Sequence, residues 1–235
     1  MKELLLKCHK EMEEFFTPYF NSYDDMANFF EKVSEHDETT RISRRMVCQI
    51  YNFVTLANDI EKIRPARDPL RIFFLKTCLE ALVEILGVDK KEFYKDFAKS
   101  ISAEGQSYIL SHFRLTDFQD WLSIPGTDRE LEFHAKHDLT IVDFFELIKV
   151  VRDKVVHDGN YWEMQFFAHD EDSIWVTALE TNELLFLKSA RYQCLDKRPR
   201  VYSFETTLNY DKFIFYFVEA CIRCVGRYMV TGKPF

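Results

Sequence analysis

A short segment of the sequence, Arg152 to His157, carries the residue types that acid–base chemistry needs. Imidazole titrates near neutral pH and can act as a general acid or base, whereas a guanidinium keeps a fixed positive charge. On a helix, Asp153 and His157 share a face, so the carboxylate can fix the imidazole tautomer and raise its pKa. The negative end of the helix dipole acts in the same direction.

The Arg152 and His157 side chains do not share a helix face, because five residues carry an α-helix about 140° past a full turn. The two groups converge only if the helix loosens at its end, or if a partner chain supplies the other half of the site. The competing interpretation is that both residues cap a helix end and pair with local carboxylates.

The surroundings of the segment are more specific than its spacing. A second match to the same spacing, Arg129 to His134, lies near a predicted loop with no apolar helix leading into it, so we treat it as a chance match. The segment at Arg152 closes a strongly apolar helix predicted over 141–156, and Asp158-Gly159-Asn160 follows as a helix stop.

At these residues the sequence resembles the HEPN superfamily, whose hallmark is an Arg, a polar residue, a short apolar stretch and a His at the end of a bundle helix. The resemblance implies a helical bundle and a homodimer in which the two motifs meet in a cleft. It also implies a metal-independent endoribonuclease, often a toxin or phage-defence effector, with an antitoxin or nucleotidyltransferase as partner. Carried over, His157 would act on the ribose 2′-OH or the leaving 5′-oxygen, Arg152 would stabilise the phosphorane charge, and Asp153 would orient the site.

The residue chemistry is consistent with RNA cleavage, because RNA supplies its own nucleophile and needs only an acid–base group and a fixed cation. We therefore expect no cofactor and no metal, and products with a 2′,3′-cyclic phosphate and a 5′-OH. The runner-up is a non-catalytic HEPN-like dimer that binds a nucleotide, a nucleic acid or a protein. The formal net charge of −8 favours the runner-up, and the polar Asp153 directly after Arg152 favours the enzyme.

An acidic chain must contact RNA through local basic patches. The predicted patch is a late basic segment made of Lys188, Arg191, Lys197, Arg198 and Arg200. An alternative patch consists of Arg41, Arg44, Arg45, Arg64, Arg67 and Arg71. Solvated surface charge is the simpler interpretation of each patch taken alone.

Two other constellations have ligand-like spacing. Cys221 and Cys224 lie inside the last predicted helix without a second pair, which favours free core cysteines over a zinc site. His134 and His137 have metal-ligand spacing, but a polar loop entering the next helix is favoured. The first residues do not form a secretory signal, and charges interrupt the most apolar stretch, so we expect a cytoplasmic protein without a membrane span.

The predicted fold is mainly α: a single HEPN-like helical domain over 1–235, with a small antiparallel β insertion at about 161–205 before the C-terminal helix. Helical periodicity predicts helices over 2–16, 22–33, 39–64, 68–86, 141–156 and 210–229, with further helical segments to about residue 113. Ser22 and Asp68 are the expected N-caps of the helices they begin, and Gly87 is the expected stop of the helix over 68–86. Residues 121–128 are predicted to form a loop. Within the β insertion, alternating and β-favouring residues predict strands at 162–168, 174–176, 184–187 and 201–204. The helices over 141–156 and 210–229 carry more apolar surface than one bundle side needs, which predicts a homodimer.

Overall fold

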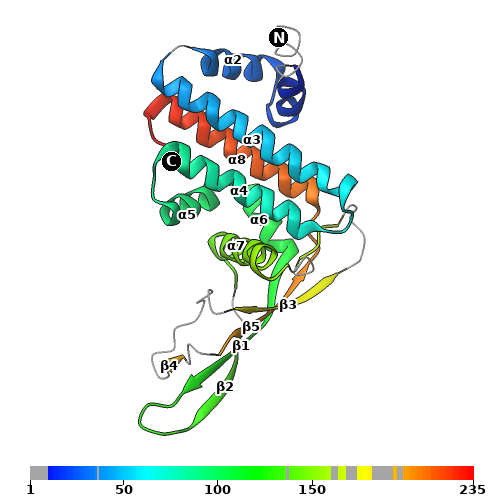
Figure 1. Cartoon of the computed structure of the whole chain (residues 1–235), viewed down its shortest axis with the longest axis vertical. Helices are drawn as coiled ribbons and strands as arrows, with labels where there is room; N and C mark the ends of the chain where they lie inside the picture. The colour runs from blue at the N-terminus through cyan, green and yellow to red at the C-terminus, as the bar shows by residue number, and fades with distance from the viewer. Residues whose placement is uncertain are drawn as a thin grey trace.

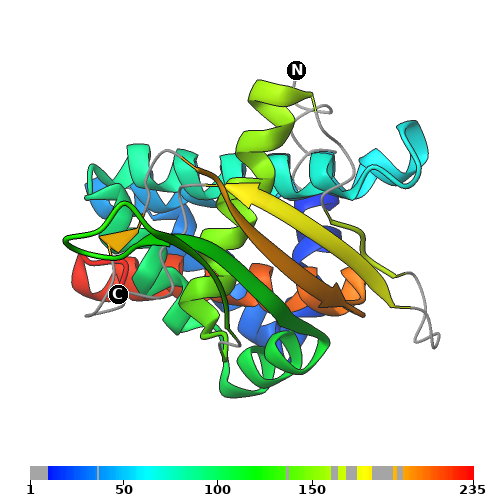
Figure 2. The same ribbon diagram turned by 90° about the horizontal axis from the view of Figure 1, so that it is seen from below.

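The computed structural model describes residues 10–35, 37–135, 138–159, 164–167, 174–181, 193–194 and 198–235. Helices form a bundle, and an antiparallel sheet lies beyond one side of it (Figure 1). Seen from below, the sheet crosses the helix that carries the Arg152 segment, so that helix lies between the bundle and the sheet (Figure 2). The mainly helical prediction with a small antiparallel sheet is confirmed.

Helix boundaries follow the capping residues. The helical elements are η1 (Thr17–Tyr19), α2 (Tyr23–Ser34), α3 (Glu38–Ile63), α4 (Asp68–Leu86), α5 (Lys90–Ser100), α6 (Ala103–His112), α7 (Ile141–Asp158) and α8 (Tyr210–Thr231). Ser22 caps α2 by accepting the Asp25 N–H, as predicted. Gly87 ends α4 with a left-handed φ of 64°, which a glycine adopts without strain. Asp68, expected to cap α4, lies in its first turn, and its side chain instead accepts the backbone N–H of Phe166.

The sheet combines strands that precede α7 in the sequence with strands that follow it. Its strands are β1 (Phe113–Ser123), β2 (Glu130–Ala135), β3 (Trp175–Thr181), β4 (Gln193–Cys194) and β5 (Arg200–Thr206). The order is β2-β1-β5-β3, with β4 paired to β1, and the strand pairs are antiparallel. The sheet is therefore not confined to an insertion at 161–205, and residues 121–123, predicted as loop, extend β1.

The expected late strands have different outcomes. Residues 201–204 lie within β5, and 174–176 overlap the start of β3. The expected strand at 162–168 is wrong in its described part, where Phe167 forms only an isolated parallel bridge to Asn209. A further strand, expected at 184–187 from the run Leu184 to Leu187, lies outside the described residues.

The apolar faces of α7 and α8 are largely buried within the chain. Phe144 of α7 packs edge-on against Phe113 of β1 and Phe213 of α8, and all three rings are buried. The large apolar side chains left exposed on these two helices are Val156, Phe215 and Val230. The sheet covers α7, and neighbouring helices cover α8, so most of the apolar surface from which the sequence predicted a dimer is buried within one chain.

Candidate functional site

Local sequence fixes the helix that carries the Arg152 segment. At its start, Thr140 and Asp143 form a capping box, in which each side chain bonds the other residue's backbone N–H. At its end, Gly159 adopts a left-handed φ of 63°. The segment therefore occupies the last two turns of a regular helix, as predicted.

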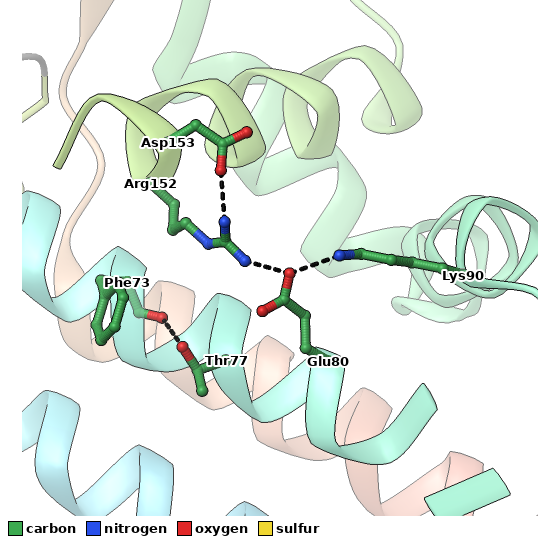
Figure 3. Close-up of polar contacts among 6 residues, drawn as sticks. All are labelled: Phe73, Thr77, Glu80, Lys90, Arg152 and Asp153. Atoms are coloured by element: carbon green, nitrogen blue, oxygen red, sulfur yellow. Dashed lines mark hydrogen bonds and ion pairs between the residues drawn. The ribbon is translucent and has the colours of Figure 1, made fainter. Parts of the chain in front are cut away.

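Arg152 is held at the junction of α7 and α4. Its Nη1 donates to Asp153 Oδ1 at 2.6 Å, and its Nη2 donates to Glu80 Oε1 of α4 (Figure 3). The same Glu80 oxygen accepts from Lys90 Nζ at 2.7 Å. The Arg152 side chain is only 18% exposed. We call Glu80, Lys90, Arg152 and Asp153 the α4–α7 charge cluster; it fixes the guanidinium in place.

The cluster also sets the ionisation of its central carboxylate. Burial alone would raise the pKa of Glu80, but the hydrogen bond from Lys90 and the charge of Arg152 hold it below its ordinary value. Glu80 therefore stays negative at neutral pH. Glu80 and Lys90 were missed from the sequence, because each lies more than 60 residues from Arg152 along the chain.

Asp153 does not orient His157 as predicted. Within the charge cluster its carboxylate binds Arg152, whereas His157 is exposed. Within the described part of the chain, His157 makes no hydrogen bond or ion pair. Because α7 stays regular through this turn, Arg152 and His157 are not brought together in one chain, and only a second chain can complete a site from them.

A buried lysine lies beside the cluster. Lys76 of α4 is 4% exposed, and its Nζ lies 2.9 Å from the ring centroid of Tyr94. Burial lowers its pKa to about 7, with Lys90 and Arg152 adding to the shift and Glu80 opposing it. The sequence held a signal for this residue, since a lone lysine follows Leu75 on the apolar helix 68–86.

Lys76 is expected to make stability pH-dependent. Its pKa of about 7 in the folded protein lies below the ordinary 10.5, so between these values the unfolded chain binds the extra proton and stability rises with pH. The measured quantity is the free energy of unfolding of wild type minus that of Lys76→Met. This difference should rise by a few kcal/mol between about pH 7 and pH 10, on the order of 1.4 kcal/mol per pKa unit.

Urea unfolding of both proteins across this range measures the difference. Exposed Lys62, paired with Asp59, provides the matched Lys62→Met control, for which the difference should stay flat. A flat difference for Lys76→Met as well would contradict the prediction.

The late basic segment is only partly an exposed surface. Arg198 is half-exposed, pairs with Glu130 at 2.8 Å and lies over the Trp121 ring. Arg200, which was also predicted to contact RNA, is 2% exposed and binds Asp120 inside the sheet at 2.8 Å, so its guanidinium does not lie on the surface. Lys188, Arg191 and Lys197 lie outside the described residues.

The alternative basic patch is also divided. Arg41 is exposed and pairs with Glu38 on its own helix, whereas Arg71 is buried and pairs with Glu61. These two arginines therefore do not share one surface, and the sequence grouping does not translate into a single patch.

The candidate metal ligands do not assemble. His134 lies exposed on β2, 3.1 Å from Asp117 and 3.4 Å from Glu132, and the Asp117 carboxylate raises its pKa. His137 lies outside the described residues. Cys221 and Cys224 are buried free thiols. Among the residues that the structure describes, no group of three or more His, Cys, Asp or Glu side chains could hold a metal ion.

The comparisons add no family. No family model matches the chain, and no curated protein or solved structure matches it. None of the described helices is long and apolar enough to cross a membrane.

Proposed function

We propose that this protein is a HEPN-like, metal-independent endoribonuclease whose site forms between two copies of the chain. The supporting observation is that Arg152 is fixed while His157, one turn later, is exposed and without a described partner. Cleavage at a 2′-OH needs such a pair: a cation held still and an imidazole free to exchange protons.

The proposed reaction uses one imidazole from each copy. His157 accepts the proton of the ribose 2′-OH, the 2′-oxygen bonds to phosphorus, and the bond from phosphorus to the 5′-oxygen breaks. His157 of the partner subunit donates a proton to the leaving 5′-oxygen. Arg152 keeps N–H donors beyond those that bind Glu80 and Asp153, because a guanidinium has five, and these would stabilise the phosphorane charge.

A second function has one observation in its favour. Two carboxylates already neutralise Arg152, and its side chain is largely buried, which weakens its attraction for phosphate. This favours a dimeric binding module in which the charge cluster is structural. The two functions differ in whether RNA is cut, so the test is cleavage of an RNA and its DNA counterpart in excess EDTA, with wild type and His157→Ala side by side.

The proposed site requires a dimer through the end of α7. Val156 is 48% exposed directly before His157, so it would lie at that interface. Light scattering at micromolar concentration should give a dimer for wild type and a monomer for Val156→Asp, because a buried carboxylate without a partner opposes association. Val230→Asp, a change at an 82% exposed position on α8, should remain dimeric. A monomeric wild type would contradict the proposal.

A further inference from the structure

A cavity of about 370 Å³ is lined by residues from the end of α3, the starts of α4 and α8, and the segment 165–167. These helix ends lie together at one end of the bundle (Figure 1). Its lining includes Glu61, Asp68, Arg71, Gln165, Phe167 and Tyr210. Its volume falls within the range of small-molecule sites. None of these residues belongs to the α4–α7 charge cluster, so the cavity needs its own explanation.

The wall of the cavity is rigidly built. Arg71 binds Glu61 at 2.7 Å and lies 3.2 Å from Asp68, and its guanidinium carbon is 4.1 Å from the ring centroid of Tyr210. The other Asp68 oxygen accepts the Phe166 N–H at 2.6 Å. Ala66, in the turn that borders the cavity, has a left-handed φ of 57°, which non-glycine residues seldom adopt.

Three polar atoms of residues that line the cavity are buried without a hydrogen-bond partner: Gln165 Nε2, Arg71 Nε and Asp68 Oδ1, the last of which has only its 3.2 Å ion pair with Arg71. The Gln165 side chain is the clearest case, since the residue is 8% exposed. Buried polar groups are almost always hydrogen-bonded, so an orphaned amide in a cavity wall indicates a missing partner. Two of the orphans are donors and one is an acceptor.

Charge and shape restrict what that partner can be. The lining holds three acidic residues, Glu61, Asp68 and Asp211, and one basic residue, Arg71, which disfavours a phosphate or any other anion. Phe167 and Tyr210 add aromatic surface to the lining, which suits a flat ligand. The donors need a carbonyl oxygen, and the carboxylate needs an N–H.

We infer that this cavity binds a nucleobase that carries a carbonyl beside a ring N–H, as guanine and uracil do, with the carbonyl facing Gln165 and Arg71 and the N–H facing Asp68. Adenine presents an amino group where the carbonyl would lie, so it should be rejected. The inference does not rest on the proposed cleavage, because it uses none of the residues assigned to that reaction.

The test is a calorimetric titration of the protein with guanosine, with uridine and with adenosine, each of which gives a dissociation constant. Guanosine or uridine should bind at least about tenfold more tightly than adenosine, since one well-made hydrogen bond is worth about that factor. Gln165→Met removes the orphan donor without adding charge, so it should weaken guanosine and uridine binding by about tenfold. Gln49→Met, the same change on α3 away from the lining, should bind like wild type.

Two further arms keep the result decisive. If Gln165→Met fails to fold, Phe167→Leu removes the stacking face while leaving the backbone bonds of Phe167 to Leu208 and Tyr210 in place, and it should also lose binding. Competition by a guanine-containing single-stranded RNA would identify the base as part of RNA, and failure to compete would identify a free nucleoside. Equal binding of all nucleosides, no binding of any, or unchanged binding by Gln165→Met would each overturn the inference.

Discussion

Replacing His157 by Ala is expected to lower the rate of RNA cleavage by about 10²–10⁴, the usual loss when a general acid–base group is removed. The loss should appear in the rate and not in stability, because the His157 side chain is exposed and has no described partner to lose. Wild-type cleavage should continue in excess EDTA and should leave DNA intact, since DNA lacks the 2′-OH nucleophile. Gel analysis of end-labelled RNA with time measures the rate.

The chain supplies a matched control for this experiment. His134 stands at the same spacing from Arg129 as His157 from Arg152, but it lies exposed on β2 and pairs with Asp117. His134→Ala should therefore cleave like wild type. Cleavage that survives His157→Ala would disprove the proposed site, and cleavage that EDTA abolishes would point to a metal-dependent reaction instead. A folded wild type that cuts no RNA would favour the binding module.

Arg152 should behave differently from His157 under the same assay. Arg152→Ala removes the proposed transition-state cation, but it also leaves the partly buried Glu80 and Asp153 carboxylates without their shared partner. We therefore expect a loss of stability together with the loss of rate. Rates for this variant need correction for the folded fraction, which circular dichroism provides.

The helices of this protein are predictable because their signals are local. Ser22 and Gly87 lie at helix ends with side chains or backbone angles that cap them. The apolar face leading to Arg152 likewise predicts α7 and places the motif in its last turns. Each of these inferences needs only residues within a few turns of one another.

The sheet and the charge cluster depend on contacts that local patterns do not contain. In β1 the register shifts between Leu115 and Asp117. The inward-facing positions therefore change from odd-numbered residues, Phe113 and Leu115, to even-numbered ones such as Phe118. This bulge breaks the strict alternation by which a strand is recognised. Glu80 binds Arg152 from 72 positions away in the sequence. The sequence therefore could not show that Arg152 and Asp153 bind each other and Glu80, which leaves His157 without a partner among the described residues.

Arg200 illustrates the same limit. In sequence it stands among basic residues and resembles part of an RNA-binding surface, because Lys197 and Arg198 precede it. Side chains alternate between the two faces of β5, and Arg200 points inward. There it binds Asp120 of β1, which lies 80 positions earlier in the sequence. An exposed cation and a buried ion pair thus look alike until the opposite strand is known.

Of the substitutions considered, those that break the buried Asp120–Arg200 pair should lower the free energy of unfolding most. Asp120→Ala removes the described carboxylate that binds the 2% exposed Arg200 guanidinium, and removing one partner of a buried pair costs about 3–5 kcal/mol. Urea unfolding measures the loss as a lower transition midpoint. Arg198→Ala breaks the half-exposed pair with Glu130 in the same sheet and should cost less than about 1 kcal/mol.

A double replacement separates charge burial from packing. If the loss comes from an uncompensated buried charge, Asp120→Leu combined with Arg200→Met should recover most of the stability, because apolar side chains of similar volume can replace a buried pair at little cost. RNA binding by the double variant should match that of wild type, since a residue buried between strands cannot reach a phosphate. A loss of RNA binding in a stable double variant would restore Arg200 to the RNA contacts, and an Asp120→Ala protein as stable as Arg198→Ala would show that the pair is not buried in solution.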